Sequence, residues 1–169
     1  MQTSTASNIR VEYLPVSSTI KDLRNTREHN NRQIKQIAGS IKAFGFNVPI
    51  LVDQNNKILA GHGRILAAQQ LELDVIPCIR LETMTEAQAR AFALADNKLC
   101  ENASWNTQLL AEIFLELNAL DLDFSIEDTG FTMGEIDLHS EGLNADQHQA
   151  DAADQSPPHA GHACCKQVR

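Results

Sequence analysis

Short apolar runs separated by segments of helical periodicity fill residues 10–82, and this order constrains the fold more than any other feature of the sequence. Apolar and polar residues alternate over 11–16, and nearly continuous apolar runs follow at 48–52, 58–60 and 75–79. Both patterns are typical of β-strands, and strands this short are stable only when they pair in a sheet or pack against a helix. The region therefore predicts an α+β fold, with a small mixed β-sheet and flanking helices.

Two helices are expected between these strands. Apolar side chains recur at spacings of three and four over 31–44, which predicts a helix that ends at Gly45. A second helix is expected over about 64–72, with its first residue between Gly63 and Ile65. The apolar face of the first helix consists of Ile34, Ile37, Ile41 and Phe44.

The sequence from residue 83 onward is expected to be helical and then disordered. Thr85 followed by Gln88 is a capping-box pattern, which predicts a helix over 86–100. A further helix is expected over 106–119, with Trp105 packed at its start. Beyond Leu143 large apolar residues are almost absent, so this tail is expected to be disordered. The core-facing stripe of the last helix consists of Leu109, Leu110, Ile113, Phe114 and Leu117.

Composition divides the chain into segments and limits its class. No apolar stretch reaches the ~18 residues that a membrane helix needs, and the first residues lack the pattern of a secretory signal. Four cysteines at irregular spacings favour a reducing compartment, so a cytoplasmic protein is expected. The expected segments are a flexible N-terminus (1–8), an α+β core (9–82), a helical extension (83–142) and a disordered tail (143–169).

The charge of the chain changes sign along its length. Residues 1–80 hold ten Lys and Arg against six Asp and Glu, a net charge of +4, whereas residues 81–169 hold four against sixteen, a net charge of −12. The basic half is suited to the phosphates of a nucleotide or of a nucleic acid. The alternative is that both halves are ordinary solvated surfaces.

The residues Gly61, His62, Gly63 and Arg64 directly follow an apolar strand and open a helix. Glycines let the backbone approach a ligand, the first amides of a helix attract anions, and the fork of an arginine binds phosphate. The four residues therefore predict an anion-binding site. A tight structural turn before a helix is the alternative.

Two other groups of polar residues are candidates for the same chemistry. Asp96 and Asn97 carry oxygen ligands of the kind that Mg²⁺ prefers when a phosphate shares the ion. A solvated helix face is the alternative interpretation. Arg27 lies in a polar stretch that fits either a ligand contact or an ordinary surface connection.

The tail contains a group of soft and borderline metal ligands. They follow the pattern His-x-x-His-x-Cys-Cys, and side chains of these types bind zinc or copper. Because no apolar core surrounds them, we favour a chance cluster over a metal site. The residues are His159, His162, Cys164 and Cys165.

In this combination and order, the motifs resemble the ParB/sulfiredoxin superfamily over residues 11–137. The resemblance is in particular to the ParB-like domain at the N-terminus of bacterial and phage DNA-modification methylases. It implies a bound nucleotide of the CTP or ATP type with Mg²⁺, held by Arg27 and residues 61–64, with Asp96 and Asn97 at the metal. The residues that carry the resemblance are Asn25, Thr26, Arg27, 40–46, 49–53, 60–64, 95–98 and Trp105.

Departures from the family pattern narrow what the resemblance implies. His62 stands where sulfiredoxins have their reactive cysteine, so no sulfiredoxin activity is expected. Gly63 stands where partition proteins have a further arginine, which weakens the expected grip on a triphosphate. No methyltransferase catalytic run is present, and no helix-turn-helix is evident after Leu120.

The expected function is that of a nucleotide-binding domain protein acting in DNA modification, partitioning, or phage and plasmid DNA transactions. DNA is expected as a partner, either directly or through a methylase. Two alternatives stay open: a Mg²⁺-dependent nuclease or nucleotide hydrolase, and a protein-interaction adaptor whose cleft has decayed.

Overall fold

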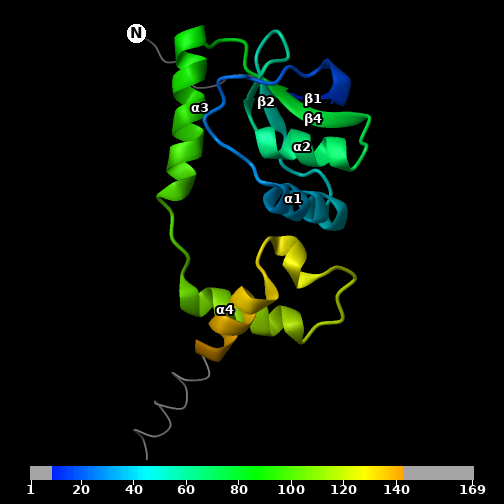
Figure 1. Cartoon of the computed structure of the whole chain (residues 1–169), viewed down its shortest axis with the longest axis vertical. Helices are drawn as coiled ribbons and strands as arrows, with labels where there is room; N and C mark the ends of the chain where they lie inside the picture. Colours follow the sequence, from blue (N-terminus) through cyan, green and yellow to red (C-terminus); the bar gives the residue numbers. More distant parts are fainter. Residues whose placement is uncertain (1–8, 143–169) are drawn as a thin grey trace, which may run out of the picture.

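The computed structural model describes residues 9–142 and contains one mixed four-stranded sheet (Figure 1). The strand order is β1-β4-β2-β3, so β1 and β3 are the edges. The central strand β4 pairs antiparallel with β1 and parallel with β2, and β2 pairs antiparallel with β3. The strands are β1 (Val11–Pro15), β2 (Ile50–Val52), β3 (Ile58–Ala60) and β4 (Val75–Arg80). The predicted α+β class is confirmed.

The helices lie beside the sheet in successive layers. In Figure 1, α2 lies next to the sheet, α1 lies beyond α2, and α4 lies beyond α1, while α3 runs along one side. The helices are α1 (Asn31–Phe44), α2 (His62–Gln70), α3 (Glu86–Glu101) and α4 (Thr107–Asn118). The short 3-10 turns are η1 (Val16–Ser18) and η2 (Ile126–Thr129), and residues 133–142 are also helical.

Buried apolar side chains form two separate clusters. The first lies between the sheet and α2, and burial of this area from water is the main force that holds them together. The second joins α4 to the helical residues 133–142. The first cluster consists of Ile50, Val52, Ile58, Ile65, Ala68, Ile76 and Cys78, and the second of Leu110, Phe114 and Ile136.

Several predicted helix boundaries are confirmed. Helix α1 spans the predicted residues, and Gly45 follows it at a φ of 86°, a conformation that glycine adopts without strain. The capping box of α3 is present in full, because the Thr85 side chain accepts from the Gln88 amide and the Gln88 side chain accepts from the Thr85 amide. Asn106 caps α4 in a similar way by accepting from the backbone amide of Leu109.

Two predicted boundaries are wrong. Helix α2 begins at His62 rather than between Gly63 and Ile65, because Gly61 is its N-cap residue in the left-handed conformation. The strand predicted over 48–52 begins only at Ile50, and Val48 is 58% exposed.

The predicted apolar faces of two helices are also only partly correct. In α4, Leu110 and Phe114 are buried, but Leu109 and Ile113 are exposed, so the core-facing stripe is narrower than predicted. In α1 only Ala38 is buried, and the predicted isoleucines are half-buried. The reason is that α1 packs on α2 rather than on the sheet, and part of its apolar face borders a cavity.

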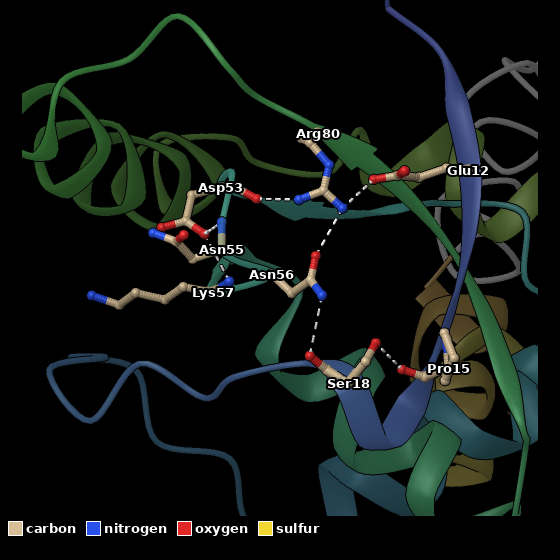
Figure 2. A network of polar contacts seen from close by, with 8 residues as sticks. All are labelled: Glu12, Pro15, Ser18, Asp53, Asn55, Asn56, Lys57 and Arg80. Carbon is tan, nitrogen blue, oxygen red and sulfur yellow. Dashed lines mark hydrogen bonds and ion pairs between the residues drawn. The ribbon is translucent and has the colours of Figure 1, made fainter.

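Arg80 holds the edge of the sheet to the β2–β3 hairpin (Figure 2). Its guanidinium donates to the backbone oxygen of Asp53 and to Oδ1 of Asn56, each at 2.7 Å, and pairs with Oε1 of Glu12 at 2.7 Å. The Asn56 amide in turn donates to the backbone oxygen of Ser18 at 3.4 Å. These contacts fix β1, β4 and the hairpin, and with them the strand that leads into α2.

Among residues 9–142, no helix has both the length and the apolar character needed to cross a membrane. The predicted disordered tail and its His/Cys cluster lie outside the residues that the structure describes, as does the predicted flexible N-terminus.

Candidate functional site

A cavity of about 620 Å³ lies at the start of α2, bordered by α1, the loop before α1, α3 and η2. All seven residues that the sequence singled out for ligand or metal binding line it, although they come from three separate parts of the chain. The volume is in the range of small-molecule sites in proteins. The seven residues are Arg27, Gly61, His62, Gly63, Arg64, Asp96 and Asn97.

The first turn of α2 presents unpaired backbone amides at this cavity. Gly61 has a φ of 97°, which turns the chain sharply from β3 into the helix, and its carbonyl accepts from Ile65 at 3.1 Å. The amides of His62, Gly63 and Arg64 are therefore the first three of the helix and have no acceptor within it. Together with the helix dipole, these amides favour an anion.

The Arg64 side chain folds back over Gly61. A Cβ atom at position 61 would lie 3.2 Å from both Nε and Nη2 of Arg64, so the glycine makes room for the guanidinium. Nε of Arg64 is buried without a hydrogen-bond partner among the described residues. Burial lowers the pKa of Arg64, and the nearby Asp96 carboxylate opposes this shift. A buried cationic donor without an acceptor is suited to an anionic ligand.

His62 is the second unpaired group of the cavity. Its Nε2 atom is buried with no hydrogen-bond partner in the described part of the chain. Burial lowers the pKa of His62; the Asp22 carboxylate works against this, while His29 and Lys57 add to it. Burial in the cavity thus favours the neutral form of the ring over its charged form.

His29 is a cavity residue that the sequence did not reveal. A Cβ atom at Gly63 would lie 3.1 Å from Cε1 of His29 and 2.8 Å from Cδ1 of Ile37. The absence of a side chain at position 63 thus lets the His29 ring and α1 approach the start of α2. This contact depends on a glycine and a histidine that lie far apart in the sequence, so no local sequence pattern predicts it.

Arg27 reaches α3 across the cavity. Its Nη1 donates to Oδ1 and to the backbone oxygen of Asn97, each at 3.4 Å. The Asn25 side chain fixes this loop by donating to the backbone oxygen of Arg27 at 2.7 Å and accepting from its amide at 3.4 Å. The predicted convergence of Arg27 with the Asp96–Asn97 pair is therefore present in the structure.

Few side chains of the cavity have oxygen atoms that could coordinate a metal ion. Asp96 lies on the same cavity as Arg64, whereas the Oδ1 of Asn97 already accepts from Arg27. Among residues 9–142 no group of three or more His, Cys, Asp or Glu side chains could hold a metal ion. The residues fit Mg²⁺ only as an ion that phosphate oxygens and water also coordinate, which is the usual mode of this ion in nucleotide sites.

One wall of the cavity is apolar, a feature that no sequence pattern predicts. It combines the face of α1 with the loop that follows, and Phe44 packs edge to face on Phe124 with ring centroids 4.9 Å apart. On the neighbouring wall, Gln36 donates to the backbone oxygen of Gly130 at 2.8 Å, which fixes η2 against α1. The apolar wall consists of Ile37, Ile41, Phe44, Phe46 and Val48.

Comparison with known proteins identifies the family to which this domain belongs. The sequence description of the ParB N-terminal domain matches residues 1–98, more than half of the chain. The chain belongs to the ParB N-terminal domain family. The wider assignment from sequence motifs is thus confirmed, whereas the association with a DNA methylase stays a prediction.

Two curated relatives share this domain. The ParB-like nuclease domain-containing protein YnaK of Escherichia coli is 36% identical over 83 residues, which cover 49% of this chain and 95% of YnaK. The probable plasmid-partitioning protein ParB of Deinococcus radiodurans is 29% identical over 119 residues, which cover 69% of this chain but only 39% of that protein.

Among solved structures, the chromosome-partitioning protein ParB of Caulobacter crescentus has the same fold. The C-terminally truncated protein, complexed with CTP-γ-S, matches with a TM-score of 0.57 and 21% identity. The match covers 64% of this chain and 62% of the Caulobacter chain. The ParB domain thus shares its fold with a nucleotide-bound partition protein.

Proposed function

We propose that this ParB-domain protein binds a nucleoside triphosphate, of the CTP or ATP type with Mg²⁺, and acts in DNA partitioning, modification, or phage and plasmid DNA transactions. The observation that carries the proposal is the start of α2, where free amides, an unpaired cationic donor and an unpaired imidazole nitrogen meet in one cavity. Arg64 Nε and His62 Nε2 are both buried there without a partner. An anion with several oxygens satisfies such donors at once.

The phosphates are assigned to the polar end of the cavity. The amides of residues 62–64 and the Arg64 guanidinium hold phosphate oxygens, and Arg27 approaches from the opposite side. Asp96 supplies an oxygen to Mg²⁺, which also takes phosphate oxygens and water. The apolar wall formed by α1 and the following loop is left for the base and the sugar.

The family relationship supports the choice of nucleotide. The Caulobacter ParB was solved with CTP-γ-S, so CTP is the first nucleotide to test, followed by ATP and GTP. The Deinococcus relative is named as a probable plasmid-partitioning protein, which supports a role in DNA transactions. That role includes DNA as a partner, bound directly or through a partner protein such as a methylase.

Calorimetric titration of the full chain with the three nucleotides, with and without Mg²⁺, tests the proposal. Loss of a charge-assisted hydrogen bond of ~1.5–3 kcal/mol in Arg64→Ala lowers the affinity by about ten- to hundredfold. Asp96→Ala weakens binding only when Mg²⁺ is present. Arg90→Ala is the matched control, because Arg90 pairs with Glu86 on the exposed surface of α3 and does not line the cavity.

The outcome of this titration is decisive in both directions. If the parent chain binds none of the three nucleotides, the proposed function is wrong and the adaptor interpretation takes its place. If Arg64→Ala binds as tightly as Arg90→Ala, the nucleotide does not occupy the start of α2.

A nuclease or nucleotide hydrolase is the second candidate. The observation in its favour is the name of the E. coli relative, which describes a ParB-like nuclease domain. Incubation of the chain with plasmid DNA and with each nucleotide in the presence of Mg²⁺ separates the two functions. Turnover that Asp96→Asn abolishes favours the catalyst, and binding without turnover favours the nucleotide-binding module.

A further inference from the structure

Two histidines line the cavity at the first turn of α2, and the fold brings them together from distant parts of the sequence. His62 is the first residue of the helix, and His29 precedes α1. His29 lies over Gly63, with Cε1 and Nδ1 only 3.1 and 3.2 Å from the place where a Cβ would be. The charge of a protonated His29 lowers the pKa of His62, so the two rings are near neighbours.

At least one nitrogen of each ring has no hydrogen-bond partner among the described residues. Nδ1 of His29 lies 3.0 Å from Oε1 of Gln33, an acceptor, so Nδ1 donates and carries a proton. Nε2 of the neutral His29 ring is then an acceptor, and it becomes a donor only when the ring is protonated. Nε2 of His62 is buried with no partner among the described residues.

The charges around the pair favour an anion in the cavity. Asp22 and Lys57 near His62 form an ion pair of 3.1 Å and so compensate each other. Arg64 on α2 and Arg27 from the loop add positive charge, and Asp96 on α3 adds one negative charge. The α1 side chains on this side, Gln33, Gln36 and Ser40, are uncharged.

We propose that His29 and His62 are phosphate-binding residues that act as imidazolium ions, so that the nucleotide binds together with at least one proton. This inference rests on the proposed function and deepens it, since it adds His29 to the site and makes the affinity depend on pH. Burial in the cavity disfavours the charged form of His62. Phosphate oxygens reverse that preference by attracting the charge and by accepting a hydrogen bond from each ring.

The direction in which nucleotide affinity changes with pH follows from the thermodynamic linkage between proton binding and nucleotide binding. The complex binds more protons than the free protein, so affinity is highest at low pH and falls as pH rises through the titration of the rings in the complex. For one proton taken up, the expected loss is about tenfold per pH unit over that range.

The test has two arms, both on the full chain. In the first, NMR follows the ring protons of each histidine between pH 5 and 9 with and without inorganic tripolyphosphate. The titrations of His29 and His62 move to higher pH when the anion is present, while that of His139, which lies against Phe114 outside the cavity, does not.

In the second arm, calorimetry measures Mg²⁺-CTP binding at pH 6, 7 and 8 in pairs of buffers with different ionisation enthalpies, which counts the protons taken up. The double variant His29→Gln/His62→Gln loses the pH dependence and the proton uptake of the parent, and His139→Gln keeps both. Protons that belong to the nucleotide itself cancel in this comparison. Far-UV circular dichroism confirms that each variant is folded.

The results of the two arms distinguish a wrong assignment of the histidines from a wrong proposed function. If the parent binds nucleotide and the double variant shows the same pH dependence and proton uptake, the histidines are not phosphate-binding residues although the function stands. If no nucleotide binds but tripolyphosphate moves both ring titrations, the histidine site stands and the proposed function is wrong. If neither anion moves either titration, the inference is overturned.

Discussion

Arg80 is a single residue that holds three segments of the chain in place. Its guanidinium is mostly buried and contacts Glu12, Asp53 and Asn56 (Figure 2). Arg80 is therefore expected to contribute more to the free energy of unfolding than an exposed ion pair does. In the exposed pair Lys98–Glu101 the side chains are 70% and 54% exposed. The Arg80 and Glu12 side chains are 21% and 38% exposed, so this pair is partly buried, and solvent screens it less than it screens the exposed pair.

We therefore expect Arg80→Met to lower the free energy of unfolding by about 2–3 kcal/mol, since two charge-assisted hydrogen bonds disappear and the Glu12 carboxylate loses its partner. Urea denaturation measures the change. Lys98→Met, in the exposed pair, leaves the midpoint unchanged. Equal midpoints for the two variants would show that the Arg80 contacts do not stabilise the fold.

Cys78 is expected to be chemically inert, in contrast to Cys100. Burial raises the pKa of the Cys78 thiol to about 11 from its ordinary 9.0, with Glu12 adding to the shift and Arg80 opposing it. Only the thiolate reacts with iodoacetamide. At pH 8.5 the exposed Cys100 is alkylated while Cys78 is protected, and peptide mapping by mass spectrometry distinguishes them.

The same shift makes stability depend on pH. In the unfolded chain the Cys78 thiol ionises near pH 9.0, but in the folded chain it keeps its proton up to about pH 11. The unfolded state is thus favoured as pH rises from 9 to 11, and Cys78→Ala reduces that part of the decline. Alkylation of folded Cys78 as fast as Cys100 would contradict both expectations.

At the scale of elements, the start of α2 depends on the backbone of Gly61. The residue combines a φ of 97° with three side-chain atoms, two of Arg64 and one of Ile50, only 3.2 Å from the place of a Cβ. An alanine there adopts a strained left-handed conformation and displaces the guanidinium. We expect Gly61→Ala to lower the free energy of unfolding by about 1–2 kcal/mol through strain alone, and further through crowding.

Gly130 provides the matched control for this variant. Its φ of 99° is nearly the same, but nothing lies within 4 Å of the place of a Cβ. Gly130→Ala therefore carries the strain without the crowding and lowers the free energy of unfolding by less than Gly61→Ala, which also weakens nucleotide binding because it displaces the Arg64 guanidinium. Thermal unfolding and calorimetry check the two effects, and an unaltered affinity in Gly61→Ala would separate Arg64 from the binding site.

The elements also show what the sequence can predict. Helix α1 and the capping box of α3 follow from local patterns, because spacing and caps are written in neighbouring residues. The residues of the 61–64 motif share one cavity with Arg27 and Asp96, as the family resemblance implied. The role of these residues in binding a nucleotide stays a prediction.

What the sequence missed depends on long-range packing. The contact of His29 with Gly63 joins residues 34 positions apart along the chain. The half-burial of Ile37 and Ile41 reflects their place on a cavity wall, which an apolar periodicity cannot distinguish from a core. The turn η2 is too short for any periodic signal, although it closes one side of the site.

At the scale of the whole molecule, the two clusters of buried residues share no member. Helix α3 connects the parts that contain them and has no buried residue of its own. The parts meet where α1 contacts η2, through Gln36 and Gly130 and through the rings of Phe44 and Phe124, and where α3 contacts β3 and the Arg27 side chain. Because the two clusters share no buried residue, the segments 9–82 and 83–142 are proposed to differ in stability.

Phe114→Ala tests this division. Phe114 is 2% exposed and contacts Phe131 edge to face at a centroid distance of 5.1 Å, so its truncation leaves a cavity in the second cluster. We expect the local free energy of opening to fall by about 3–4 kcal/mol. Hydrogen exchange then accelerates in α4 and in residues 133–142 but not in β2, β4 or α2, because these elements belong to the other cluster.

A reciprocal variant, Ile76→Val, tests the first cluster of buried residues. Ile76→Val removes one methylene from a fully buried side chain of β4 and costs about 0.5–1.5 kcal/mol in the first cluster. It accelerates exchange in the sheet and in α2, while α4 keeps the rates of the parent.

Since the cavity is lined from both parts, nucleotide slows exchange in both when it is bound, through Arg64 on one side and Gly130 on the other. Uniform acceleration of exchange along the chain in either variant would show one cooperative unit instead of two.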